Sequence, residues 1–523
     1  MRGTELMNVM NIIEKANNQG IVIAFENNSL SLIYQKNKVL EPSILQELQK
    51  NRSQIIEYFQ KNKVGPENGA QIAGQDGGIV RNGQLYHPIT PIQLYWVNDD
   101  IDKDYKKDDH FHGNIALLYK VSGNFDLNVF DKAMLAVIDR HEVLHSTFHK
   151  IDETYMMKIE AVNPEKYKSC FYDFTAFPTP TKDALKDITG FAGHDFQLDQ
   201  GPLFIARVIR ESEKNHIVAF RIHHSISDTW SNQILLRDIM IAYNSFCGGT
   251  IPVFRELAYQ FKEYMSFICR HNEENRLEHK LYWQKRFPNL PQKFFLPCAK
   301  KTAKRNISEK IKGIEKFKLN TGLVGILSAL SKKSSASMFI VLQALFKKYI
   351  FNQTGLNDIL LGTYIFGRDH PGTEDLIGSF AKLVLLRASV SHNDSILDIV
   401  QKVKESNEDM MRINAFSLFE FSSMSLPPGE EINDYWKIDM QYADSSSFLR
   451  AQNDNANTDS QPDVQFFPLR REVSNLIPID MEIEFFYMNV EIELTVKYDT
   501  GIYTSEGLRC FIEGFIYQIH LLG

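Results

Sequence analysis

The chain has 523 residues, of which 43% are hydrophobic and 12% aromatic, and this supplies enough apolar side chains for one large or two medium cores. Lys and Arg number 58 against 65 Asp and Glu, and the formal net charge of −7 gives no reason to expect nucleic acid as a partner. The five cysteines include no C-x-x-C pair, and no run approaches the roughly 20 apolar residues of a membrane span. We therefore expect a cytoplasmic protein with no membrane anchor, no disulfide framework and no thiolate zinc site.

The first 60 residues predict a small unit of their own. Apolar residues recur at helical spacing over 6–20 and again over 43–60, and two apolar runs flank Asn27 and Asn28, which suit a tight turn. The order is helix, hairpin, helix. Residues 61–84 are rich in Gly, Asn and Gln and predict a flexible linker. A unit of this size has no room for a catalytic cleft, so binding through its exposed sheet edges is the expected role.

The stretch from Leu6 to Phe59 resembles the N-terminal docking domains of the tubulysin-synthetase type, which stand at the start of nonribosomal peptide synthetase subunits. The resemblance implies that the unit binds the C-terminal tail of an upstream subunit, often acidic, as a strand beside the hairpin. A basic face could meet such a tail, while the alternative is that its charged residues are ordinary solvated side chains. The expected docking residues are Tyr34, Lys36, Lys38, Lys50 and Arg52.

The larger remainder alternates strand-like and helix-like runs, which predicts an α/β (α+β) architecture. The expected strands are 114–123, 216–222, 358–367, 383–390 and 490–498, and the expected helices include 127–144 and 229–246. A strand, a polar loop and a helix therefore surround the stretch "RIHHSISDTW", residues 221–230.

Three kinds of chemistry could use His223 and His224 in this stretch. Neighbouring residues of an extended segment point in opposite directions, so the two imidazoles are poorly placed to share a zinc ion. A hydrolase triad lacks the G-x-S-x-G elbow. General base catalysis by one histidine fits better, with Asp228 holding the turn through hydrogen bonds or an arginine.

The segment "HHSISDTWS" resembles the H-H-x-x-x-D-G motif of nonribosomal peptide synthetase condensation domains, relatives of chloramphenicol acetyltransferase. Six ordered motifs are far more specific than one, and five family motifs besides the histidine motif follow the right order over residues 84–523. These are "TPIQLYW" (90–96), "RHEVLHSTF" (140–148), "FKEYMSF" (261–267), "IGSFAKLVLLR" (377–387) and "NAFSLFEF" (414–421).

The sequence departs from the family pattern in places. His145 stands for an arginine and Thr229 for a glycine. Further departures are Lys382, Leu383, Asn414 and Leu418. They put details of the acceptor side in doubt but leave His224 and Asp228 in place.

The resemblance implies two acetyltransferase-like lobes in a V, here 85–265 and 266–523, with the histidine motif midway along a tunnel between them. Two carrier domains would bring phosphopantetheine-bound substrates, with no cofactor bound to the chain itself. His224 would act as the base or as the positioner of an amine that attacks a thioester, and His223 would be structural. Asp228 would form an internal ion pair, for which Arg368 is the preferred partner ahead of Arg140 and Arg387.

Related activities remain to be separated. Heterocyclization domains replace the histidine motif, and epimerization domains lack the "SLFEF" context, so amide-forming condensation is preferred. A catalytically silent recruitment domain and an ester-forming acyltransferase are the alternatives. Gly523 directly follows the segment expected to form the last helix of the fold. If the chain ends there naturally, we expect a terminal condensation subunit that uses a free amine; otherwise the acceptor is expected on a carrier.

Overall fold

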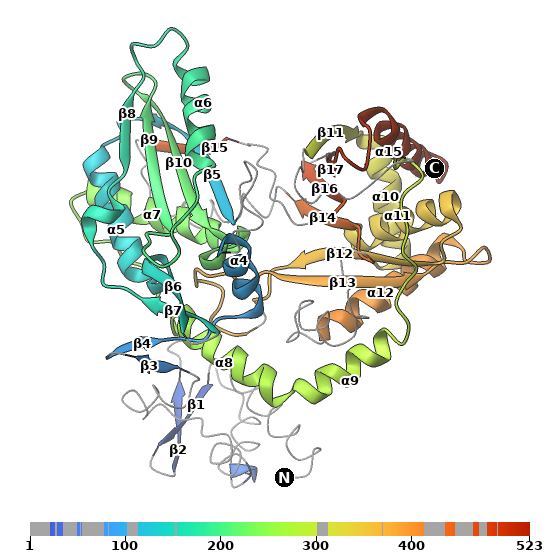
Figure 1. Cartoon of the computed structure of the whole chain (residues 1–523), viewed down its shortest axis with the longest axis horizontal. Coiled ribbons are helices and arrows are strands. Elements are labelled where there is room, and N and C mark those ends of the chain that lie inside the picture. Colours follow the sequence, from blue (N-terminus) through green and yellow to red (C-terminus); the bar gives the residue numbers. More distant parts are fainter. Residues whose placement is uncertain are drawn as a thin grey trace. The chain divides into compact units, whose positions relative to one another are not determined.

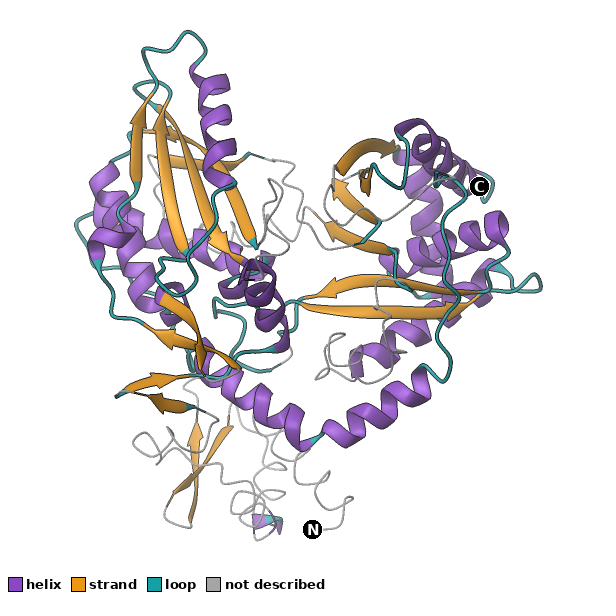
Figure 2. Cartoon of the chain, in the orientation of Figure 1, coloured by secondary structure: helices purple, strands orange, loops and turns teal. Residues whose placement is uncertain are grey.

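The computed structural model describes residues 21–26, 29–34, 50–52, 54, 78–81, 83–101, 113–151, 154–300, 312–368, 370–412, 435–444, 464–469, 479–488 and 490–523. The chain divides into two compact units, Met1–Val80 and Arg81–Gly523. Helices and strands are both abundant (Figure 2), so the predicted mixed α/β class is confirmed.

The first unit contains the predicted hairpin. Strands β1 (Ile21–Glu26) and β2 (Ser29–Tyr34) pair antiparallel, and the register runs from Ile21 opposite Tyr34 to Glu26 opposite Ser29. Asn27 and Asn28, where the turn is predicted, lie between the paired ends of these strands and outside the described residues. The helix expected over 6–20 lies outside the described residues, as does most of the helix expected over 43–60.

The end of the predicted linker, residues 61–84, is not coil. Residues 79–81 form strand β3 (Ile79–Arg81), and β4 (Gln84–Tyr86) follows. β-branched Ile79 and Val80 favour an extended backbone, and Gly83 supplies the positive φ of 74° that the turn between the strands requires. Residues 61–77 lie outside the part of the chain that the structure describes.

A five-stranded sheet forms the first half of the second unit. The strand order is β15-β5-β10-β9-β8, with β10 antiparallel to both β5 and β9. The bounds are β5 (Asn114–Gly123), β8 (Cys170–Asp173), β9 (Phe204–Arg210), β10 (Asn215–His223) and β15 (Val464–Pro468). A separate hairpin consists of β6 (Ser146–Ile151) and β7 (Thr154–Ile159).

Alternate side chains of β10 face opposite helices, as the period of a strand requires. Val218, Phe220 and Ile222 join the core with α5 (Leu127–Arg140) and α7 (Thr229–Cys247), whereas Ile217 and Ala219 pack with α6 (Pro180–Ala192). Figure 1 shows α6 on one side of this sheet and α5 with α7 on the other. The predicted strands at 114–123 and 216–222 are confirmed, with β10 extending one residue beyond the prediction at each end.

A six-stranded sheet dominates the second half, in the order β11-β17-β16-β14-β12-β13. Its strands are β11 (Lys312–Leu319), β12 (Asp358–Ile365), β13 (Lys382–Ser389), β14 (Ile438–Asp444), β16 (Met481–Met488) and β17 (Glu491–Asp499). The helices that pack against it in a common core are α10 (Thr321–Ser334), α11 (Met338–Thr354), α12 (Ile396–Arg412) and α15 (Ser505–His520). The expected closing helix is thus present as α15.

The predicted lobe boundary at residue 265/266 falls inside a helix. α8 (Phe261–Glu274) runs across this boundary and begins at a capping box formed by Gln260 and Glu263, and α9 (Arg276–Arg286) follows. Two later segments also return to the first half. β15 pairs with β5, and Leu376, Ile377 and Phe380 enter the core of the five-stranded sheet. The first half is therefore completed by segments distant in the sequence.

Candidate functional site

The histidine motif lies at the junction of β10 and α7. His223 is the last residue of β10, residues His224–Ile226 form a 3-10 turn, η6, and Asp228 caps α7. The cap is direct, since Asp228 Oδ1 accepts from the Ser231 backbone N–H at 2.7 Å. The strand, polar turn and helix predicted around this motif are therefore present.

Asp228 and Arg368 face each other in a nearly dry environment. Arg368 Nη2 lies 3.2 Å from Asp228 Oδ1, and each side chain is only 5% exposed. The other carboxylate oxygen accepts from the Phe380 backbone N–H at 3.0 Å. Both oxygens of the buried carboxylate are thus satisfied, as a buried charge requires.

Further bonds fix the guanidinium of Arg368. Its Nη2 also donates to Ser231 Oγ at 2.6 Å, and its Nη1 donates to the carbonyls of Thr373 and Leu376. Burial lowers the pKa of Arg368, while the charge of Asp228 acts to raise it. The two other arginines considered for this pairing bind elsewhere: Arg140 contacts Asp238, and Arg387 contacts Asp358.

His223 is fully buried on the α6 side of the sheet. Its Nδ1 lies 2.6 Å from Ser225 Oγ, and its ring meets Phe196 edge to face. Gly113 passes close by with a φ of 65°, and a Cβ there would stand 2.4 Å from His223 Nε2. Only glycine fits such an approach, so the surroundings of His223 are those of a packed structural residue.

The side chain of His224 has different surroundings from that of His223. Its side chain is half-buried and its ring stacks on Trp96, with centroids 4.4 Å apart and planes inclined by 16°. Its backbone N–H donates to the Gly113 carbonyl at 2.6 Å. Of the two neighbouring histidines, His224 is therefore the one that reaches a partly open environment.

The role of α4 (Pro91–Ile101) at this site was not predicted from the sequence. Trp96 comes from this helix, and Gln93 Nε2 donates to the Ser225 carbonyl at 2.9 Å. Gln93 is fully buried, and its Oε1 accepts from the Thr90 backbone N–H. The signal was present in "TPIQLYW", where Gln and Trp lie three residues apart on one face of a helix.

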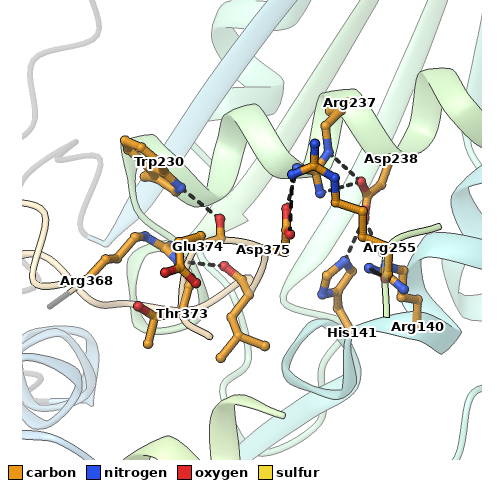
Figure 3. A network of polar contacts seen from close by, with 11 residues as sticks. Arg140, His141, Trp230, Arg237, Asp238, Arg255, Arg368, Thr373, Glu374 and Asp375 are labelled. Atoms are coloured by element: carbon orange, nitrogen blue, oxygen red, sulfur yellow. Dashed lines mark hydrogen bonds and ion pairs between the residues drawn. The ribbon is translucent and has the colours of Figure 1, made fainter. Parts of the chain in front are cut away.

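A second polar network continues along α7 (Figure 3). Asp238 is 1% exposed and accepts from Arg140, His141 and Arg237. Burial raises the pKa of the Asp238 carboxyl, but the bond from His141 and the charge of Arg237 outweigh it and leave the pKa lowered. Arg237 also binds Asp375, so α7 contacts the segment after β12 at two places. The network therefore joins Arg140 and His141 of the "RHE" segment to the helix that follows the histidine motif.

The expected docking residues are only partly described. Tyr34 ends β2, and Lys50 and Arg52 are exposed. Lys36 and Lys38 lie outside the described residues.

Two further findings concern the part of the chain that the structure describes. Among the residues that the structure describes, no three His, Cys, Asp or Glu side chains are grouped as a metal site would require. Over the same residues, no helix has the length and apolar character needed to cross a membrane. The arrangement at the motif is one partly open imidazole beside a buried ion pair. Such an imidazole can accept a proton or hold a nucleophile by a hydrogen bond.

Known proteins resemble the second unit in sequence. The family model described as "Condensation domain" matches residues 86–522. A linear gramicidin synthase protein of Brevibacillus parabrevis is 27% identical over 301 residues, which is 57% of this chain and 6% of that protein. Bacitracin synthase 1 of Bacillus licheniformis is 24% identical over 421 residues, or 78% of this chain and 7% of that protein. The chain thus spans less than a tenth of either relative.

Solved structures have the same fold. The X-domain from teicoplanin biosynthesis superposes with a TM-score of 0.71 at 18% identity, over 85% of this chain and 96% of that one. The starter condensation domain of rhizomide synthetase RzmA gives a TM-score of 0.66 at 16% identity, over 84% of this chain and 96% of that one.

Proposed function

Because the chain belongs to the condensation-domain family of nonribosomal peptide synthetases, we propose that it forms an amide bond between a carrier-bound acyl or peptidyl thioester and an amine. The observation that carries this proposal is the position of His224: half-buried at the end of β10, stacked on Trp96, and four residues before a carboxylate held by Arg368. Substrates would arrive on the phosphopantetheine arms of carrier domains, and no cofactor of its own is required.

The proposed reaction uses His224 on the acceptor side. The amine nitrogen attacks the thioester carbonyl, the new C–N bond forms, and the C–S bond breaks. His224 takes the proton that the amine loses, or holds the amine while that proton leaves, and the proton ends on the departing phosphopantetheine thiolate. Alignment of the two substrates supplies much of the rate enhancement, and general base catalysis adds on the order of 10²- to 10⁴-fold.

Asp228 and Arg368 are proposed to shape the site without contacting the reacting atoms. Both side chains are buried, and their hydrogen bonds run to α7 and to the segment after β12. Since Asp228 also begins α7, the ion pair fixes the point at which the chain leaves η6. Loss of either partner would release the turn that bears His224.

We propose that residues 1–60 dock an upstream synthetase subunit. Among the described residues, β1 and β2 form a sheet of two strands, to whose edge a C-terminal tail could add as a further strand. We propose that an acidic tail binds to Tyr34, Lys36, Lys38, Lys50 and Arg52. None of the five cysteines, all of which lie in described segments, is in a disulfide, which favours a reducing compartment, and we propose the cytoplasm.

One comparison supports a second candidate function. An X-domain from teicoplanin biosynthesis forms a complex with OxyB, and that structure matches this chain with a TM-score of 0.70 at 17% identity over 85% of this chain and 94% of that one. A domain that recruits another protein without forming a bond is therefore the alternative. The intact histidine and the ion pair beside it favour catalysis.

The deciding experiment supplies an acyl thioester on a carrier domain together with a free amine, an aminoacyl carrier, or an alcohol. Products are identified by mass spectrometry against a matched His224→Gln variant. Amide from the free amine supports a terminal subunit, and amide from the aminoacyl carrier supports an internal one. Ester from the alcohol would instead indicate an ester-forming acyltransferase. No product from any acceptor, with carrier binding retained, would support the recruitment function instead.

A further inference from the structure

Trp96 stacks on His224 with a specific geometry. The two rings are nearly parallel, with a 16° inclination and a centroid separation of 4.4 Å. Trp96 is only 6% exposed, so the indole is held in place by packing. The indole also meets Tyr95 edge to face, at 4.9 Å and 70°. One face of the imidazole is therefore covered by a fixed flat surface.

The helix that bears Trp96 is also tied to the turn that bears His224. The Gln93 amide donates to the Ser225 carbonyl at 2.9 Å, one residue after His224. Gln93 is in turn bonded to Thr90 at the start of α4. Two residues on one face of α4 thus contact η6. Gln93 hydrogen-bonds its backbone, and Trp96, three residues later, stacks on the His224 side chain.

A stacked indole affects the two protonation states of an imidazole unequally. The face of the indole carries negative quadrupolar charge, so it attracts the imidazolium more than the neutral ring. The described titratable groups next to η6 have partners of their own. His223 is directed to the α6 face, Asp228 is bound by Arg368, and Tyr95 packs against Trp96.

We propose that Trp96 is the positioning residue of His224: its indole fixes the plane of the imidazole and stabilises the imidazolium that forms when the imidazole takes a proton. Gln93 supports the same function by holding η6 at a constant distance from α4. The assignment of His224 to amide formation rests on the proposed function, whereas the stack and its electrostatic effect do not.

The test is an NMR titration of the full chain with ¹³C-labelled histidine, in which the His224 signal is assigned by its loss in His224→Gln. Wild type is compared with Trp96→Phe, which keeps an aromatic face, and with Trp96→Leu and Trp96→Met, which remove it. Removal of the face should lower the pH midpoint of the His224 titration by about half a unit and abolish the ring-current shift of its ring protons. Trp96→Phe should retain most of both effects. Tyr95→Phe is the matched control on the same helix and should change neither.

Kinetics provide the second readout. Trp96→Leu should lower kcat by about tenfold or more with little change in KM, and Trp96→Phe should restore most of the loss, since orientation of a reacting group affects the transition state more than substrate binding. An unchanged midpoint and unchanged ring-proton shifts in both Trp96→Leu and Trp96→Met would overturn the proposal. The expected NMR changes in a protein that forms no amide would instead refute the proposed function and leave the stack established.

Discussion

Replacement of Asp228 by alanine tests the ion pair at the candidate site. The substitution leaves Arg368 charged and 5% exposed with no carboxylate, deprives the Phe380 N–H of its acceptor, and removes the cap of α7. Breaking a buried pair by removing one partner costs about 3 to 5 kcal/mol, and this range already includes much of the cost of the stranded charge. Loss of the cap adds about 1 kcal/mol. We expect the free energy of unfolding to fall by about 4 to 6 kcal/mol.

The assay is urea unfolding followed by circular dichroism and tryptophan fluorescence, in wild type, Asp228→Ala, Asp228→Asn, Arg368→Met and the double variant Asp228→Ala/Arg368→Met. Asparagine keeps a capping oxygen, so Asp228→Asn should lose less stability than Asp228→Ala. The double variant should lose less than the sum of the two single variants, by about 1 to 3 kcal/mol, because it leaves no unpaired charge behind.

The matched control is an exposed ion pair on α8 and α9. Glu273 and Arg276 lie 3.6 Å apart with side chains 74% and 64% exposed, and Glu273→Ala should cost less than about 0.5 kcal/mol. If Asp228→Ala costs no more than this control, or if the losses of the two single variants simply add, the ion pair does not stabilise the site and its proposed role in placing His224 fails.

Three further outcomes are expected. His224→Gln should lower amide formation by at least about a hundredfold with an unchanged unfolding midpoint, and retained turnover in a mass-spectrometric assay would contradict the assignment. Deletion of residues 1–60 should leave turnover intact with a carrier at high concentration and reduce it with the natural upstream subunit at low concentration, because docking supplies roughly millimolar effective levels of donor; equal losses at both concentrations would argue against docking. Burial lowers the pKa of Lys347 to about 7 from its ordinary 10.5, so the unfolded chain binds more protons between those values and the free energy of unfolding should rise with pH across that window. Urea titrations at about pH 7 and about pH 9.5 should show a larger rise in wild type than in Lys347→Met, and parallel changes would refute the shift.

Local pattern was enough to predict the elements around the site. The strand at 114–123 is present with the predicted bounds, and α7 covers the predicted helix at 229–246 with one further residue. In both segments the apolar periodicity can be recognised from residues that are close together in the sequence. α7 also begins directly after Asp228, a strong capping residue. The hairpin of the first unit was predictable for the same reason, since its two apolar runs flank a pair of asparagines, which suit a tight turn.

Two elements end earlier than their apolar periodicity predicts, because a contact with a residue distant in the sequence determines where each one ends. The helix expected over 127–144 ends at Arg140, because His141 takes an extended backbone and bonds Asp238 on α7. The strand expected over 358–367 ends at Ile365, and Gly367 then adopts a φ of 61° against the Phe380 carbonyl. The sequence near these two ends does not identify Asp238 or Phe380 as a contact, so a prediction from periodicity alone makes both elements too long.

Arg368 illustrates how the two sources of prediction combine. A buried Asp228 carboxylate needs a cation beside it, and the sequence contains several arginines. Nothing in the spacing of these arginines shows which of them is the partner. The ranking came from the family resemblance. The structure gives the physical reason: the segment after β12 leaves its sheet at Ile365 and places Arg368 against the first turn of α7, where Ser231 and the Thr373 carbonyl also bind it.

The same segment explains why the site needs both halves of the second unit. Arg368, Asp375 and Phe380 all come from the chain between β12 and β13. Arg368 contacts α7 at its cap, and Asp375 contacts Arg237 on the same helix. The Phe380 N–H donates to Asp228, and its ring lies in the core of the five-stranded sheet. The position of His224 therefore depends on a segment far along the chain, since Asp228 and Arg368 are separated by 140 positions. Under the proposed function, a mutation in that segment that never contacts substrate would lower the rate of amide formation, because it moves the helix start to which the turn bearing His224 is joined.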